Sequence, residues 1–99
     1  MTDFDADYVI THVRYVGHHI DAVRRHRPAD DGLGDPVEVP RGAVVQDLDL
    51  GLDYMTAFHE NGDWIPGDEV ITYHADGERF IRTTGDDHPE DNLSGLPEF

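Results

Sequence analysis

The sequence has 99 residues, a length typical of one domain, and it carries 22 Asp and Glu against 7 cations, all of them arginine. The resulting net charge of −15 disfavours polyanionic partners such as nucleic acids. Cysteine is absent, which excludes disulfides, thiolate metal sites and cysteine nucleophiles. No apolar run approaches the ~18 residues of a membrane span, and residues 1–7 do not resemble a signal peptide, so we expect a cytoplasmic protein without membrane contact.

The acidity itself predicts a habitat. Self-repulsion at this charge destabilises a compact chain in dilute buffer, whereas at ~1 M salt the Debye length is only ~3 Å and the carboxylates hardly interact. Because 37% of the residues are hydrophobic and fall in patterned segments, a folded domain is favoured over a disordered chain. We therefore expect a protein adapted to molar salt.

In chain order, residues 1–7 are expected to form a flexible acidic arm, and residues 8–99 a single domain. Residues 8–16 are rich in β-branched and aromatic side chains, which predicts a first strand. Gly17-His18 is a plausible tight turn into a returning strand over residues 19–27.

The register of this hairpin stays open in the sequence. A two-residue loop sets Arg14 opposite Asp21, whereas a three-residue loop sets Val13 opposite Val23.

A surface loop is expected over residues 28–39, because prolines, glycines and acidic residues gather there. Pro40 opens the predicted helix, residues 40–50, and Gly51 stands where a left-handed C-terminal cap is expected. The residues 54–59 predict a third strand, with Tyr54, Thr56 and Phe58 on one face.

The Asp76-Gly77 dipeptide is typical of a type I′ turn, and it predicts a hairpin of strands 69–75 and 78–84. Its register sets Tyr73 opposite Phe80 and Ile71 opposite Arg82. The expected fold is therefore α+β, a small antiparallel sheet of about five strands with one helix packed on a face, in the order β-β-α-β-β-β.

Three motifs resemble a family of small, uncharacterised bacterial and archaeal proteins that is classed as a domain of unknown function. Tyr8-Val9-Ile10-Thr11 followed by Arg14 is similar to the start of that family. Phe80-Ile81-Arg82-Thr83 and the ending Asp91-Asn92-Leu93 with Leu96-Pro97-Glu98-Phe99 are similar to its later part. The resemblance implies a free-standing domain, and it implies no activity, cofactor or catalytic residue.

Two arginines inside apolar strands, Arg14 and Arg82, are the first candidate binding residues, because an unpaired buried charge is very costly. Asp91 is the expected partner of Arg82, and Asn92 is expected to cap the turn beside it. This junction of strand and tail is either a bridge that pins the tail to the sheet or a recognition site. We likewise expect Leu93, Leu96 and Phe99 to dock on the sheet, the alternative being a free motif for a partner protein.

Catalytic chemistry finds little support in the sequence. The histidines lack the H-x-x-x-H and H-E-x-x-H spacings of zinc sites, and Ser94, the only serine, lies outside any nucleophile motif. No phosphate-binding glycine loop is present. We expect no catalytic residue, no metal and no cofactor.

The one basic cluster of the sequence comprises Arg24, Arg25 and Arg27. It either holds a phosphate or carboxylate partner or forms ion pairs with the abundant aspartates, and nucleic-acid binding requires all three on one exposed face.

We therefore predict a small non-catalytic module that binds a ligand or a protein partner. The alternatives are a small-ligand or metal-dependent enzyme that uses the histidines and, third, a nucleic-acid-associated regulator.

Overall fold

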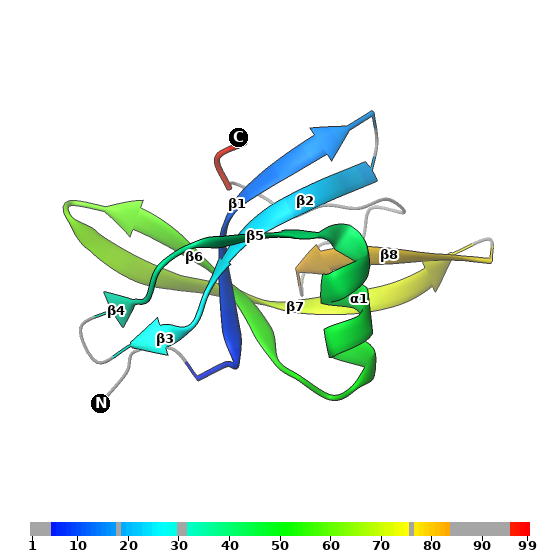
Figure 1. Ribbon diagram of the computed structural model, residues 1–99, viewed down its shortest axis with the longest axis horizontal. Helices are drawn as coiled ribbons and strands as arrows, with labels where there is room; N and C mark the ends of the chain where they lie inside the picture. Colours follow the sequence, from blue (N-terminus) through cyan, green and yellow to red (C-terminus); the bar gives the residue numbers. More distant parts are fainter. Residues whose placement is uncertain (1–4, 18, 30–31, 76, 84–95) are drawn as a thin grey trace.

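The protein is mostly β in a computed structural model that describes residues 5–17, 19–29, 32–75, 77–83 and 96–99. Six strands form a sheet in the order β5-β2-β1-β6-β7-β8, and β3 and β4 form a separate two-stranded sheet (Figure 1). The elements are β1 (Tyr8–Val16), β2 (His19–His26), β3 (Pro28–Ala29), β4 (Gly32–Leu33), β5 (Val37–Pro40), α1 (Arg41–Asp49), β6 (Tyr54–Glu60), β7 (Asp63–Ala75) and β8 (Glu78–Thr83).

This architecture shows that the expected fold class was wrong. The sheet is mixed, because β1 and β6 run parallel with Tyr8 opposite Tyr54, while its other neighbouring strands are antiparallel. The strand order and the size of the sheet also differ from the expected β-β-α-β-β-β arrangement. A single helix on the sheet is the part of that expectation with which the structure is compatible.

Two of the differences arise in segments that contain proline. Strand β5 lies in the segment expected to be a loop, where Pro36 and Pro40 hide a short strand that pairs with β2. Strand β7 begins at Asp63 and runs through Ile65-Pro66-Gly67, ahead of the strand expected over residues 69–75. Gly67 is required there, because a Cβ at this position would overlap Thr56 Oγ1 and come within 2.8 Å of Phe58 Cε2.

The first hairpin resolves its register in an unexpected way. Val16 lies opposite His19, as a two-residue loop demands, yet Val13 lies opposite Val23. An irregularity between Arg14 and Tyr15 shifts the pairing by one residue, so both sequence alternatives describe part of the hairpin. The second hairpin confirms the predicted register, with Tyr73 opposite Phe80 and Ile71 opposite Arg82.

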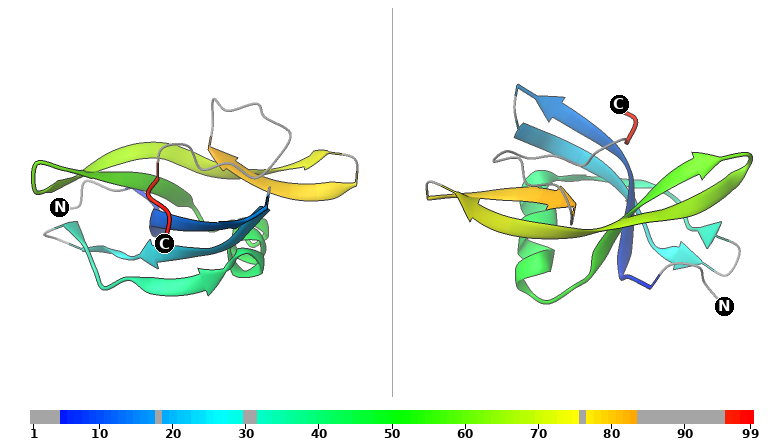
Figure 2. Two further views of the ribbon diagram at one scale, coloured as in Figure 1. Left: turned by 90° about the horizontal axis from the view of Figure 1, so that it is seen from above. Right: turned by 180° about the vertical axis from the view of Figure 1, so that it is seen from behind.

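Helix α1 begins one residue after Pro40 and ends as predicted. The Gly51 N–H donates to Leu48 O and the Leu52 N–H to Asp47 O, which is the Schellman pattern, and Gly51 adopts a φ of 90°. The helix packs against β2, β5 and β7, and Asp49 forms an ion pair with Arg79 of β8. The sheet therefore curls around α1, with strands from both of its edges reaching the helix (Figure 2).

The core is divided into two clusters. The larger contains Ile10, Val13, Val23, Val44 and Ile81 among others, and it includes the buried side of α1. The smaller centres on Val9 and Ala57, against which Leu33 and Trp64 pack. Strand β1 contributes to both clusters, which makes it the central strand of the molecule.

The tail residues 96–99 dock on β1, as expected, whereas Leu93 lies outside the described residues. The Val13 N–H donates to Pro97 O over 3.0 Å, and the Phe99 N–H donates to Val13 O over 3.1 Å. Leu96 is buried in the larger core cluster. The start of β1 thus pairs with β6, and its later part pairs with the tail.

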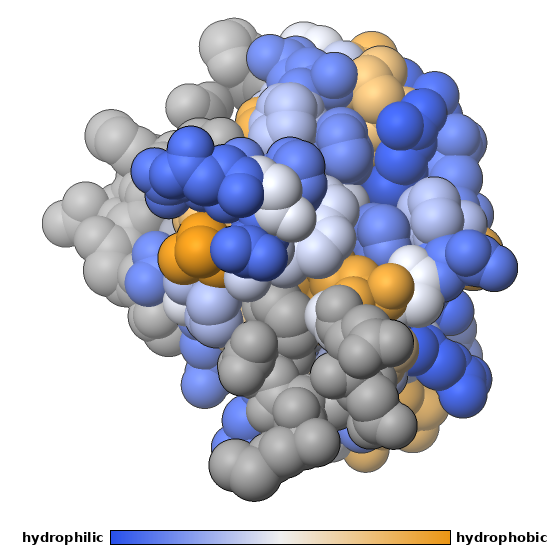
Figure 3. Space-filling view, turned by 90° about the vertical axis from the view of Figure 1, so that its left-hand side faces the viewer, coloured by the Kyte–Doolittle hydropathy of each residue, from blue (hydrophilic) through white to orange (hydrophobic). Residues whose placement is uncertain are grey.

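The molecular surface is mainly hydrophilic on the side seen in Figure 3, where apolar side chains form separate patches. The large apolar side chains that are exposed, Val16, Val37, Leu50 and Ile65, belong to different parts of the chain. No helix within the described residues is long and apolar enough to cross a membrane.

Candidate functional site

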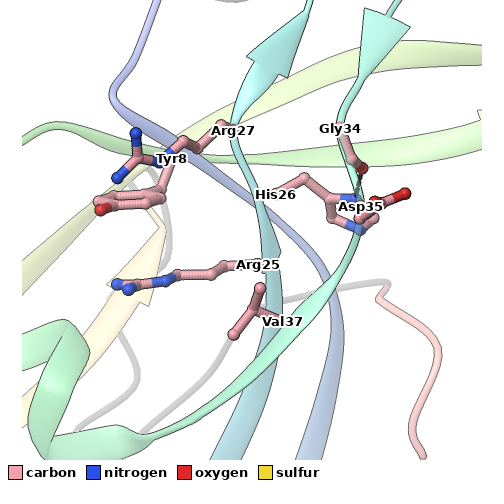
Figure 4. A pocket seen from close by; sticks show the side chains of 7 residues that line it. All are labelled: Tyr8, Arg25, His26, Arg27, Gly34, Asp35 and Val37. Atoms are coloured by element: carbon pink, nitrogen blue, oxygen red, sulfur yellow. Dashed lines mark hydrogen bonds between the residues drawn. The ribbon is translucent and has the colours of Figure 1, made fainter.

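A cavity of about 370 Å³ opens between β1, β2 and the segment that leads into β5 (Figure 4). It is lined by Tyr8, Arg25, His26, Arg27, Gly34, Asp35 and Val37. Tyr8 begins β1, the next three residues end β2 or follow it, and the last three precede or begin β5. The site is thus held by the register of β1 on β2 and of β2 on β5.

Arg25 is fixed by a polar network below the pocket. Its Nη1 donates to Asp47 Oδ2 over 2.8 Å and to the Tyr54 hydroxyl over 2.5 Å, and that hydroxyl donates to the same Asp47 oxygen over 2.7 Å. The Arg25 and Asp47 side chains are only 20% and 21% exposed. Burial raises the pKa of the Tyr54 hydroxyl, and the hydrogen bond to Asp47 raises it further, so Tyr54 stays neutral.

Tyr8 lies between two guanidinium groups. Arg25 Cζ is 4.0 Å from the centre of the Tyr8 ring, and Arg27 Cζ is 5.7 Å from it. The two groups lie on opposite sides of the ring (Figure 4). Arg27 is exposed and forms no ion pair with any residue that the structure describes. Its charge is therefore available at the mouth of the pocket.

His26 forms the opposite wall and is only 7% exposed. Its Nδ1 lies 2.8 Å from Gly34 O, and because a carbonyl only accepts, Nδ1 carries the hydrogen. Its Nε2 lies 2.8 Å from Thr11 Oγ1, which also lies 2.9 Å from His12 Nδ1. Both ring nitrogens of His26 are thus engaged, and the ring holds the Gly34 segment against β2.

The predicted basic cluster is divided between the two faces of the sheet. Arg24 Cζ lies 4.4 Å from the centre of the Phe99 ring, whereas Arg25 and Arg27 contact Tyr8. Alternation along β2 produces this division, because neighbouring side chains of a strand point to opposite faces. The ion pair expected with an aspartate is confirmed for Arg25, and the single exposed face that nucleic-acid binding requires is not formed.

The predicted site residues fall partly outside the described chain. Arg14 forms ion pairs with Asp21 and Glu38 and lies 5.0 Å from the Phe99 ring centre, so it does meet the tail. Arg82 lies in β8, with β6 and β7 between it and β1 in the sheet order. Asp91 and Asn92 lie outside the described residues, so a binding role for these four residues stays a prediction.

The histidines show no metal centre in the part of the chain that the structure describes, which contains no group of three or more His, Asp or Glu side chains able to hold an ion. The pKa of His12 is lowered, first by burial and then by the positive charges of Arg24 and His26. His59 packs against Trp64 with ring centres 4.9 Å apart. His12, His26 and His59 thus have structural partners among the described residues.

Sequence reasoning recognised the arginines of the pocket and missed their aromatic and apolar neighbours. Alternation places Arg25 and Arg27 on one side of a strand, which was a usable signal. The position of Tyr8 depends on the bulged register of β1 on β2, and that of Val37 on a strand hidden between prolines. Neither could be obtained from residue spacing.

Together these features define a small, mostly β domain with a mixed sheet and a cationic pocket at the ends of its central strands. The chain belongs to the family DUF3892, described as a protein of unknown function, which matches residues 9–97 and confirms the expected membership in a family of that kind. No curated protein and no solved structure matches the chain.

Proposed function

We propose that this protein is a small non-catalytic binding module that takes an anionic ligand in the pocket of Tyr8, Arg25, Arg27 and Val37. One observation carries the proposal: two guanidinium groups flank one aromatic ring at the wall of a cavity of about 370 Å³. Small-molecule sites typically have this form, a mostly apolar hollow with a few fixed polar groups.

The charge of Arg27 indicates an anion. In a chain of net charge −15, carboxylates far outnumber cations, yet Arg27 contacts an aromatic ring and forms no ion pair with a described carboxylate. A guanidinium group can donate two parallel hydrogen bonds to a carboxylate or a phosphate. Arg25 gives the site a second cation, which Asp47 and Tyr54 already hold in place. Ligand binding therefore does not have to order the Arg25 side chain.

The groups of the pocket support binding rather than catalysis. Arginine stays protonated at neutral pH and does not act as a base. His26 uses both ring nitrogens within the fold, one for Gly34 and one for Thr11. Asp35 is exposed and its carboxylate faces solvent at the rim.

The test is a titration of the amide NMR spectrum with acetate, benzoate and inorganic phosphate, on the wild type and on two charge-matched variants. Arg27→Gln removes the exposed cation of the pocket, and Arg24→Gln removes an equal charge from the opposite face of the same strand. We expect at least one anion to shift the amides of Tyr8, Gly34 and Val37.

We also expect the dissociation constant to rise by about 10–100-fold in Arg27→Gln, because a charge-assisted hydrogen bond contributes about 1.5–3 kcal/mol. Arg24→Gln is expected to bind as the wild type does. If no anion shifts these amides, or if both variants weaken binding equally, the proposal is wrong.

We further propose that the acidic surface is an adaptation to a cytoplasm at molar salt. The excess of carboxylates over arginines supports this, because screening at ~1 M removes most of their mutual repulsion. We expect the midpoint of urea unfolding to rise steeply between dilute buffer and molar KCl. A flat dependence would make the acidity a clue to function instead.

A further inference from the structure

We infer that the ligand of this pocket is a monocarboxylate whose body is one apolar ring or a short branched chain. The inference rests on the proposed function and adds the class of ligand. Three features of the pocket carry it: the balance of charge on its walls, its size, and an exposed valine at its edge.

The charge balance favours one negative charge over two. Arg25 already donates to Asp47, so much of its charge is compensated within the fold. Asp35 stands at the rim of the pocket, with its carboxylate directed away from the arginines (Figure 4). Arg27 is the cation left to be neutralised by the ligand, so a second negative charge on the ligand would have no uncompensated cation beside it among the described lining residues.

The size of the pocket excludes a large ligand. At about 370 Å³ the cavity lies near the lower end of the range of about 300–1,000 Å³ that small-molecule pockets span. A single ring with a carboxylate fits that space. The ligand is thus expected to be compact.

Val37 points to an apolar body. Val37 is 53% exposed, although it lines a cavity and lies opposite Arg25 in the pairing of β2 with β5. Both faces of the Tyr8 ring are already covered by guanidinium groups, so Tyr8 offers its edge to the ligand. A ring or branched chain laid against Val37 would remove this apolar surface from water.

The test compares probes that differ by one feature, by calorimetry or NMR titration of the full chain. Benzoate has one ring and one charge, acetate lacks the ring, phthalate adds a second carboxylate to the same ring, and phenyl phosphate replaces the carboxylate. We expect benzoate to bind about tenfold more tightly than acetate, as burial of a small apolar group predicts. We also expect it to bind more tightly than phthalate and phenyl phosphate.

Two variants assign these differences to residues. Val37→Ser is expected to abolish the advantage of benzoate over acetate, while Val16→Ser, an exposed valine in β1, leaves it unchanged. Asp35→Asn is expected to strengthen phthalate binding selectively, because it removes a negative charge from the rim of the pocket and so lowers the repulsion of a second carboxylate.

The outcomes separate the inference from the function on which it rests. If phenyl phosphate or phthalate binds best at these amides, or if acetate equals benzoate, the binding function stands and the monocarboxylate is wrong. If none of the four probes binds, the proposed function itself is wrong.

Discussion

The hydroxyl of Tyr54 offers the sharpest test of the network beneath the pocket. It accepts from Arg25 over 2.5 Å and donates to Asp47 over 2.7 Å, in a side chain that is 1% exposed. Tyr54→Phe keeps the ring and its contact with Tyr8, whose ring centre lies 5.2 Å away, and removes only these two bonds. The variant therefore isolates the energy of the hydroxyl.

The magnitude follows from what the hydroxyl leaves behind. Arg25 and Asp47 keep their direct bond of 2.8 Å, so neither charge is isolated in the variant. A hydrogen bond to a charged group typically contributes about 1.5–3 kcal/mol, so we expect the free energy of unfolding to fall by about 2 kcal/mol. For a domain of this size the melting temperature should then fall by roughly 8–16 °C.

The assay is urea unfolding at molar KCl and neutral pH, followed by the fluorescence of Trp64, the one tryptophan of the chain. Tyr8→Phe is the matched control, and we expect it to change stability by less than about 0.5 kcal/mol, as is usual for substitutions outside such networks. A loss below about 0.5 kcal/mol for Tyr54→Phe would refute the reasoning that this hydroxyl stabilises the Arg25–Asp47 pair.

The same side chain predicts a pH dependence. The pKa of Tyr54 is raised above its ordinary value of 10.0, so the unfolded state loses this proton first as the pH rises. Its contribution to stability is complete below pH 10 and is lost as the pH rises beyond that value. Stability measured between pH 9 and pH 11 should therefore fall more steeply for the wild type than for Tyr54→Phe, and parallel curves would contradict this.

Three further predictions concern the sheet and its tail. Gly67→Ala should lower the free energy of unfolding by about 1–3 kcal/mol, because the added Cβ has no space. Gly42→Ala, in the open first turn of α1, should instead raise the free energy of unfolding by up to ~1 kcal/mol. Urea unfolding measures both variants, and equal effects would contradict the packing argument. Phe99→Ala should speed hydrogen exchange of the Val13 amide by about tenfold, because it removes a ring held by two arginines; an unchanged rate would show that the ring does not hold the tail. The pKa of His12 is lowered in the folded state, so the unfolded state binds its proton first and stability should fall as the pH drops below 6.5. His12→Gln should flatten this loss of stability, and an equally steep loss in the variant would contradict the prediction.

How far the sequence predicts this fold depends on how local each signal is. The Asp76-Gly77 turn fixes its hairpin because the pairing follows from the two turn residues and alternation alone. Gly51 likewise marks the end of α1 within one turn of helix. Such elements need no knowledge of distant residues.

The rest depends on contacts that join distant parts of the chain. The parallel pairing of Tyr8 with Tyr54 has no local signal, and it converts the expected antiparallel sheet into a mixed one. The strand β5, which follows Pro36 and ends at Pro40, is stabilised by pairing with β2, and this pairing outweighs the unfavourable effect of the prolines. The pocket inherits this limit, because Tyr8 reaches the arginines only through the register of β1 on β2, and Val37 only through the pairing of β5 with β2.

The docked tail has a consequence at the far edge of the sheet. Val13 directs both its N–H and its C=O to the tail, so it forms no backbone hydrogen bond with Val23, the residue opposite it on β2. The N–H and C=O of Val23 must therefore point toward Val39 of β5. The outward-facing nitrogens of β5 then belong to Glu38 and Pro40, and proline has no hydrogen to donate. The β5 edge therefore offers a neighbouring chain one backbone donor, the N–H of Glu38, next to the carboxylate of the same residue. Such an edge is a poor template for the strand pairing between molecules that begins aggregation.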